Sequence, residues 1–378
     1  MRRKLLPWAA CALLLYLLAL RNLHRPPTPA GRPAARFWKA PCPLRSLWSQ
    51  DLLERQRRRR SVSRDRAPGC GPDRQVESRV ADFQQLPQAV KDFLLYRRCR
   101  HFPRLLEPRG VCGRGLRLLI AIKSTASSFV RRQAIRQSWG GLGRASGVGL
   151  VFLLGVEEEA DGHPGLAAQL ACESRRYGDL LQWAFRDTFL NLTLKEVLFL
   201  PWLGRRCPGA RFIFKGDDDV FVNTERLLDY LDGPEPGASP GPALHRSPDL
   251  FLGDAIFGAK PCRNPRLKYY VPGAFYNGPY PPYAGGAGVL YAGRLARRLE
   301  RAARALPLFP IDDVFTGMCL RRLGLAPTAH AGFRSFGINE SQRWEPCAYR
   351  RLLMVHGRSP QEVVLLWRML HQGNLTCG

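Results

Sequence analysis

The chain has 378 residues, of which 45% are hydrophobic, and a formal net charge of +27. This length and apolar content exclude a chain too small or too polar to bury a sizeable core, and they allow one large catalytic domain or two ordinary ones. The excess positive charge concerns solubility and partners rather than the fold.

The N-terminus predicts a membrane anchor. Basic residues at positions 2–4 precede an uncharged run, 5–20, which Arg21 ends. Sixteen residues is short for a membrane span, but early secretory membranes are thinner than average. The basic residues favour a cytoplasmic tail at 1–4. We therefore expect a type II signal anchor. A cleaved signal peptide is the alternative, although no convincing small-x-small cleavage site follows the run.

Two further patterns predict a lumenal location. Sequons for N-glycosylation begin at Asn191, Asn339 and Asn374. There are eleven cysteines and no metal-type CxxC pair, and Cys11 lies in the anchor, which leaves an even number for an oxidising compartment. In the lumen the positive charge would meet no nucleic acid, so an anionic glycan is the better partner for it.

Residues 21–85 are rich in proline and arginine and predict an extended stem. Within it stand four arginines, 57–60. They are typical of a solvated basic stretch. They also allow a dibasic-type cleavage before Ser61 that would release the catalytic domain, or a contact with an anionic polysaccharide or a lipid surface.

If the stem is cut near Arg60, replacing Arg59 and Arg60 together by alanine should abolish a secreted form, because the protease loses its basic recognition residues. The measurement is an immunoblot of the culture medium against the cell lysate. Unchanged secretion would contradict cleavage at this site.

The lumenal domain is expected over 86–378, where strand-like and helix-like segments alternate. The expected strands are 117–124, 149–155, 180–185 and 210–219, and the expected helices are 128–139, 165–179 and 192–207. Alternation of this kind predicts an α/β fold with a mostly parallel sheet flanked by helices. Sites on such sheets lie at the carboxyl ends of the strands.

The segment FIFKGDDDVFVN ends the last of these strands in three adjacent carboxylates. Side chains alternate along an extended chain, so Asp217 and Asp219 point to one side and Asp218 to the other. Hard divalent cations prefer such oxygen ligands and often share them with substrate phosphates. The motif therefore predicts a cation–diphosphate site, the alternative being an acidic turn that caps the following helix.

A second acidic motif, PIDDVFTGMCLRRLG, places Asp312 and Asp313 at the start of a helix. They could stabilise the helix terminus, or one of them could act as a general base. Between the two motifs, YPPYAGGAGVLYAG predicts a glycine-rich loop that a ligand approaches closely, with Tyr280, Tyr283 and Tyr291 available to stack on sugar rings.

The motifs AIKS, RRQAIRQSWG, VFLLG, YGDLLQW, NLTLKE, FKGDDDVFVN, LKYYVP, YPPYAGG, PIDDVFTGMCLRRLG and LLMVHGRSPQE follow one another in the chain. In this order the sequence resembles the β-1,3-N-acetylglucosaminyltransferases, part of the β-1,3-glycosyltransferase superfamily (glycosyltransferase family 31). The resemblance covers roughly 86–377. It implies a GT-A fold, a type II Golgi membrane protein, Mn²⁺, a UDP-GlcNAc donor and a galactose-terminated acceptor extended as in poly-N-acetyllactosamine. The resemblance also allows a homo-oligomer or a hetero-oligomer with other glycosyltransferases.

The resemblance also implies residue roles. Asp219 resembles the direct metal ligand and Asp217 a ligand nearer the ribose, with His356 completing the shell and His330 as the alternative. Asp313 corresponds to the catalytic base, with Asp312 next. The substrate-binding residues expected from pattern and resemblance are Lys123, Arg132, Arg136, Asp179, Lys215, Asp217, Asp218, Tyr283, Gly285 and Gly286.

One departure concerns the glycine-rich stretch, which relatives write as AGGGG and this chain as AGGAG. If position 287 requires positive φ, Ala287 costs energy there. The stretch also differs from the Cys-Ser-Gly-Thr-Gly type of the galactosyl relatives, which makes β-1,3-galactosyl transfer the less favoured alternative. An inactive lectin-like or chaperone-like relative is the other alternative, but the intact aspartate cluster argues against it.

Overall fold

The computed structural model describes residues 70–80, 83–143, 146–157, 165–233, 247–372 and 375–377. The predicted tail, anchor and arginine run, and Asn374, lie outside these ranges. Within them, no helix has the length and apolarity that a membrane span requires.

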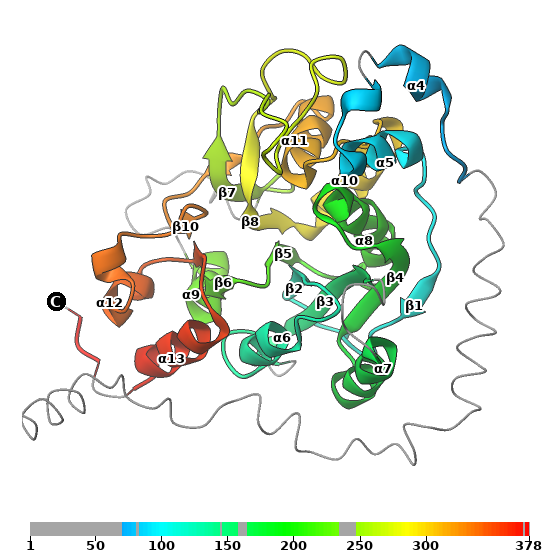
Figure 1. The fold of residues 1–378 in the computed structure, drawn as a ribbon. Coiled ribbons are helices and arrows are strands. Elements are labelled where there is room, and N and C mark those ends of the chain that lie inside the picture. Colours follow the sequence, from blue (N-terminus) through cyan, green and yellow to red (C-terminus); the bar gives the residue numbers. More distant parts are fainter. Residues whose placement is uncertain are drawn as a thin grey trace, which may run out of the picture. The chain divides into compact units, whose positions relative to one another are not determined.

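The largest element is an eight-stranded sheet with the order β1-β4-β3-β2-β5-β8-β7-β9 (Figure 1). Its strands are β1 Arg104–Leu106, β2 Leu118–Lys123, β3 Val148–Val156, β4 Leu180–Arg186, β5 Phe212–Asp217, β7 Phe251–Ile256, β8 Tyr283–Ala292 and β9 Thr328–Ala329. Strands β4, β3, β2 and β5 are parallel, β9 is parallel to β7, and β1, β8 and β7 form antiparallel pairs. The predicted α/β fold with a parallel-rich sheet is confirmed.

Helices flank this sheet and the segments around it (Figure 1). They are α4 Gln75–Arg79, α5 Gln88–Tyr96, α6 Phe129–Arg136, α7 Leu166–Tyr177, α8 Leu192–Arg206, α9 Thr224–Asp232, α10 Gly293–Ala305, α11 Asp312–Arg322, α12 Pro346–Arg350 and α13 Pro360–Leu370. Every residue of β2 is buried, as expected for a parallel strand covered on both sides. Alternate residues such as Leu119 and Ala121 join the core beneath α8, α10 and α11, while α6 packs against α13.

A small second sheet joins the chain's C-terminal part to the first acidic motif. It contains β10 Phe333–Arg334, β11 Met354–His356 and β6 Val220–Val222, in that order. Strand β11 runs antiparallel to β6, and His356 lies opposite Val220. This register places the imidazole beside the aspartates that precede β6, although more than a hundred residues separate them in the sequence.

The packed structure extends N-terminal to residue 86, because Val76 and Phe83 belong to the hydrophobic core and Cys70 is disulfide-bonded to Cys99. Two further disulfides join Cys112 to Cys207 and Cys347 to Cys377, and Cys172 is also disulfide-bonded. Cys262 and Cys319 are free thiols.

The glycine-rich stretch is not the loop that the sequence predicted but the first half of β8. Gly285, Gly286 and Gly288 are absent from the glycines with positive φ. Neighbouring side chains leave no room for a larger residue at these positions. An added Cβ would lie 2.8 Å from Ser335 Oγ at Gly285 and 2.9 Å from Phe214 at Gly288. Ala287 is buried within this strand, so no left-handed conformation opposes its side chain.

Candidate active site

The first acidic motif lies at the carboxyl end of β5, as predicted. Asp217 ends β5, and Asp218 and Asp219 form the turn into β6. One ligand atom each from Asp217, Asp219 and His356 lie within 4.8 Å of one another, and His356 Nε2 is 3.4 Å from Asp219 Oδ1. The hydrogen bond from His356, with its charge, outweighs burial and lowers the pKa of Asp219. Two carboxylates and an imidazole fit a divalent cation.

The alternative that these aspartates cap the following helix does not hold. Helix α9 is capped by Asn223, whose side chain accepts a hydrogen bond from the backbone N–H of Arg226. Asp218 points away from the cation-binding cluster, as the strand alternation predicted, and accepts a 2.7 Å hydrogen bond from Ser124 Oγ. Burial raises the pKa of Asp218 to about 6 in spite of this bond.

Lys123, the last residue of β2, connects the two acidic motifs. Its ammonium group lies 2.9 Å from Asp217 Oδ1 and 2.8 Å from Asp312 Oδ2. Burial alone would lower the pKa of Lys123, but the carboxylates of Asp217, Asp312 and Asp313 outweigh it and hold the pKa well above its usual value. The lysine thus remains charged and fixes the two motifs at one end of the sheet.

Asp312 and Asp313 begin α11, yet neither caps it, and they differ in environment. Asp312 is buried and accepts a hydrogen bond from Lys123. Burial alone would raise the pKa of Asp312, but the charge of Lys123 outweighs this effect and lowers the pKa. Asp313 keeps part of its surface exposed, and its Oδ2 accepts a 2.9 Å hydrogen bond from the backbone N–H of Gly286. Burial and the charge of Asp312 raise the pKa of Asp313 to about 8. An accessible carboxyl group that titrates near neutrality suits a general base.

Gly286 leaves the space that the Asp313 carboxylate occupies, so we predict that Gly286→Ala impairs transfer. The added Cβ would overlap that carboxylate, and a displacement of about 1 Å costs on the order of 100-fold in rate. Gly204→Ala in α8 is the matched control, because its Cβ would meet Glu300 Oε2 at an ordinary 3.6 Å. Initial rates for both variants test this; equal activity would contradict the close packing.

The raised pKa predicts that Asp313→Asn stabilises the free protein increasingly with pH. The unfolded carboxyl group ionises near pH 4 and the folded one near pH 8. The unfolding free energy of the unmodified chain therefore falls across this window, and the asparagine variant lacks that fall. Thermal unfolding in EDTA should show a Tm gain for the variant that grows from pH 5 to pH 8 and reaches at least about 2 °C. A gain independent of pH would contradict the raised pKa.

Arg132, Arg136 and Asp179, predicted at the nucleotide, form a buried network behind the strand ends. Arg132 donates 2.8 and 2.7 Å hydrogen bonds to Glu173 of α7 and a third of 3.0 Å to the carbonyl of Ala126. Arg136 binds Asp179 through two hydrogen bonds of 2.7 and 2.8 Å. Arg132 is 0% exposed, and these hydrogen bonds connect the turn after β2 to α7.

Three other predicted residues occupy different surroundings. Lys215 is buried and paired with Glu196 of α8. His330 contacts the rings of Tyr230 and Phe333 and is not part of the cluster of Asp217, Asp219 and His356. Tyr283, at the start of β8, is half-buried; burial raises its pKa, with a smaller contribution from Asp313.

Ser124 and Arg131 also reach the acidic turn, although neither was predicted from the sequence. Ser124 follows β2 and reaches Asp218, while its carbonyl accepts a 2.6 Å hydrogen bond from Lys195. Arg131 Nε lies 3.8 Å from Asp218 and its Nη1 4.0 Å from Asp219. Helical spacing gives a signal for Arg131, since Phe129, Arg132 and Arg136 recur at the inward-facing positions and leave Arg131 on a neighbouring face.

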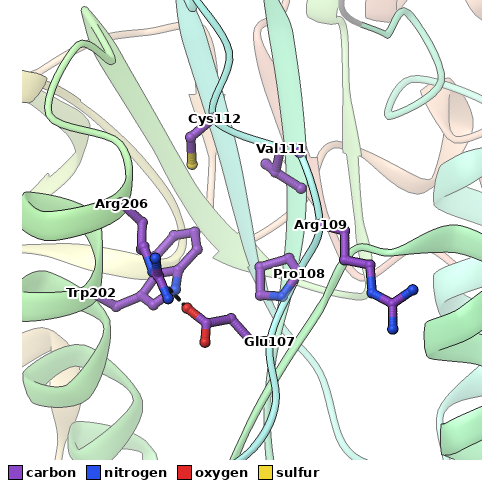
Figure 2. Close-up of a pocket in the computed structure, with 8 residues that line it drawn as sticks. Glu107, Pro108, Arg109, Val111, Cys112, Trp202 and Arg206 are labelled. Carbon is purple, nitrogen blue, oxygen red and sulfur yellow. Dashed lines mark hydrogen bonds and ion pairs between the residues drawn. The ribbon is translucent and has the colours of Figure 1, made fainter.

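Two hollows at α8 do not belong to this site. Figure 2 shows one of about 520 Å³, where Arg206 reaches the carboxylate of Glu107 at 2.7 Å beside Trp202. The other, about 730 Å³, shares Trp202 and lies between α8, α10 and residues 100–104. The predicted acidic residues line neither.

Of the sequons, Asn339 is exposed, whereas Asn191 donates a 2.9 Å hydrogen bond to the carbonyl of Arg186.

Comparison with known proteins supports an assignment. Residues 130–331 match the family model described as galactosyltransferase. N-acetyllactosaminide β-1,3-N-acetylglucosaminyltransferase 2 from Mus musculus is 45% identical, with 91% of this chain and 89% of that protein aligned. UDP-GlcNAc:βGal β-1,3-N-acetylglucosaminyltransferase 7 from Mus musculus is 46% identical, over 78% of this chain and 74% of that protein.

The acetylgalactosaminyl-O-glycosyl-glycoprotein β-1,3-N-acetylglucosaminyltransferase of Homo sapiens is also 46% identical, over 79% of this chain and 78% of that protein. These alignments cover most of each protein, and the family match over residues 130–331 spans the positions of both acidic motifs. The chain belongs to the galactosyltransferase family and, within it, to the β-1,3-N-acetylglucosaminyltransferases.

Proposed function

We propose that this chain transfers GlcNAc from UDP-GlcNAc, in β-1,3 linkage and with inversion, to a terminal galactose of glycan chains. The observation that carries the proposal is the meeting of the cluster of Asp217, Asp219 and His356 with Asp312 and Asp313, joined through Lys123 at the ends of β2 and β5. The names of the relatives give the donor and the acceptor class.

The donor set fits a bound cation. Carboxylate oxygens and an imidazole nitrogen suit Mn²⁺, and Asp219, Asp217 and His356 would hold it, with the nucleotide diphosphate as the remaining ligand. When bound, the ion supplies positive charge that offsets the charge of the departing diphosphate. The GT-A fold expected from the resemblance agrees with this placement.

The chain's own residues account for the proton. Asp313, held by the Gly286 N–H, accepts the proton of the galactose 3-hydroxyl group. The oxygen then forms its bond to C1 of GlcNAc while the bond from C1 to the β-phosphate oxygen breaks, and that electron pair leaves with UDP. A single displacement converts the α-linked donor into a β-linked product. Asp312 stays paired with Lys123, which leaves Asp313 as the group that the hydroxyl reaches.

We further propose a type II protein of the Golgi membrane that works in the lumen. The predicted anchor, the sequons and the cysteines support this location. The disulfides Cys70–Cys99, Cys112–Cys207 and Cys347–Cys377 agree with an oxidising compartment. Poly-N-acetyllactosamine, or a keratan-type chain, is the product class that we expect.

The linkage of the product tests the proposal. The purified chain, Mn²⁺, UDP-GlcNAc and a lactosamine acceptor should give a product whose new linkage, by proton NMR, is β and on the galactose 3-position. An α linkage, or attachment at another hydroxyl group, would contradict the inverting role of Asp313. Galactosyl transfer from UDP-Gal is the second candidate, because the superfamily and the matching family model include galactosyltransferases.

A further inference from the structure

Arg131, in the first turn of α6, is the arginine that faces the candidate site. Its side chain is 36% exposed, whereas its neighbour Arg132 is wholly buried and fully engaged with Glu173 and the turn after β2. The two differ because adjacent positions on a helix point about 100° apart. The outward direction carries Arg131 to the turn that holds Asp218 and Asp219.

The contacts of Arg131 are incomplete. Its Nε and Nη1 approach Asp218 and Asp219 at 3.8 and 4.0 Å, beyond hydrogen-bond distance. Nη1 is nevertheless buried and has no hydrogen-bond partner among the residues that the structure describes. A buried donor on a charged group is costly when it is left unsatisfied. A group from outside the chain could therefore satisfy this donor.

The surroundings identify that partner as an anion at the cation cluster. Asp218 is already held by Ser124 Oγ at 2.7 Å, and Asp219 lies beside His356 at 3.4 Å. With Asp219 among the proposed cation ligands, an arginine next to it would meet the oxygens that this cation shares. A guanidinium group binds phosphate oxygens through paired, charge-assisted hydrogen bonds.

We propose that Arg131 binds the diphosphate of the nucleotide donor and stabilises it as it leaves. This inference deepens the proposed function and rests on it for the nature of the donor. As the bond between C1 and the β-phosphate oxygen breaks, negative charge grows on that phosphate. The guanidinium group of Arg131 would stabilise this charge with hydrogen-bond donors that are already positioned. In this proposal Arg132, which the resemblance placed at the nucleotide, is a positioning residue: it is buried beneath the site and holds the turn at Ala126.

The test compares nucleotides that differ only in their phosphates. The dissociation constants of UDP and uridine are measured with Mn²⁺ for the unmodified chain, Arg131→Gln and Arg131→Lys, by calorimetry and ligand-observed NMR. We expect Arg131→Gln to weaken the affinity for UDP about 10- to 100-fold and to leave the affinity for uridine unchanged. Arg131→Lys should recover part of the loss, because it keeps the charge but not the fork. Arg114→Gln, an exposed arginine in the loop before β2, is the control.

Equal weakening of UDP and uridine by Arg131→Gln, with an unchanged unfolding midpoint, would overturn the proposal, and so would an unchanged UDP affinity. A lowered midpoint with the ratio of UDP to uridine affinity unaltered would assign Arg131 to the fold and equally overturn it. If the unmodified chain binds UDP but transfers no GlcNAc, the proposed function fails while the phosphate-specific loss still supports Arg131. If the unmodified chain does not bind UDP, both fail.

Discussion

Asp313→Asn should reduce the turnover of GlcNAc transfer by about 10²- to 10⁴-fold, the usual contribution of general-base assistance. The asparagine oxygen can still accept the 2.9 Å hydrogen bond from the Gly286 N–H, so the side chain should keep its position. What it loses is the ability to take the proton of the acceptor hydroxyl. Initial rates at saturating donor and acceptor measure the effect.

Two comparisons separate this loss from damage to the site. UDP binding by Asp313→Asn should match that of the unmodified chain, since the nucleotide is assigned to the other acidic motif. Asp312→Asn should behave differently, because it removes one of the two carboxylates paired with the buried Lys123 and so disturbs the charge balance and the fold. Near-normal turnover in Asp313→Asn would refute the assignment of the base.

Asp219→Ala should lower the affinity for Mn²⁺ at least about 100-fold and abolish most of the transfer. Removing a residue that merely orients a metal ligand costs about 10- to 100-fold in metal affinity, and Asp219 is assigned as a direct ligand. Direct binding of Mn²⁺ in the presence of UDP, followed by the electron paramagnetic resonance of the free ion, measures this without relying on activity.

His356→Ala should also lower the affinity for Mn²⁺, since the imidazole lies beside Asp219. Asp218→Asn is the control from within the same motif, because its carboxylate points to Ser124 rather than into the cation-binding cluster. It should keep its affinity for Mn²⁺. If Asp218→Asn lost the ion and Asp219→Ala kept it, the orientation of the motif would be wrong.

The central strands were predictable from the sequence because each is an uninterrupted apolar run. The run 117–124 became β2 at Leu118–Lys123, and the run before the aspartates became β5. The same alternation predicted that Asp218 points away from Asp217 and Asp219. The strands follow from local properties of the chain, whereas Asp218 lies in the turn after β5 and is held by Ser124, which is distant in the sequence.

The glycine-rich stretch was mispredicted for a physical reason. Glycine is disfavoured in strands and typical of turns, so the stretch indicated a loop. In β8 the glycines make room for Asp313 and Ser335, which lie far along the chain. No local pattern reveals such a requirement.

Arg131 and Arg132 illustrate a second limit. Both belong to one short motif, and the resemblance selected Arg132. The pairing of Arg132 with Glu173 and of Arg136 with Asp179 depends on α7 packing beside α6, which sequence alone does not locate. His356 could be assigned to the metal only through the resemblance; its position results from the pairing of β11 with β6.

The most direct measurement offers UDP-GlcNAc and UDP-Gal in parallel to the purified chain, with a lactosamine acceptor, with Mn²⁺ and with EDTA. We predict transfer of GlcNAc, little or none of galactose, and loss of transfer in EDTA that added Mn²⁺ restores. Transfer of galactose in place of GlcNAc, or transfer of GlcNAc that EDTA leaves unchanged, would contradict the function and the cation site proposed for this chain.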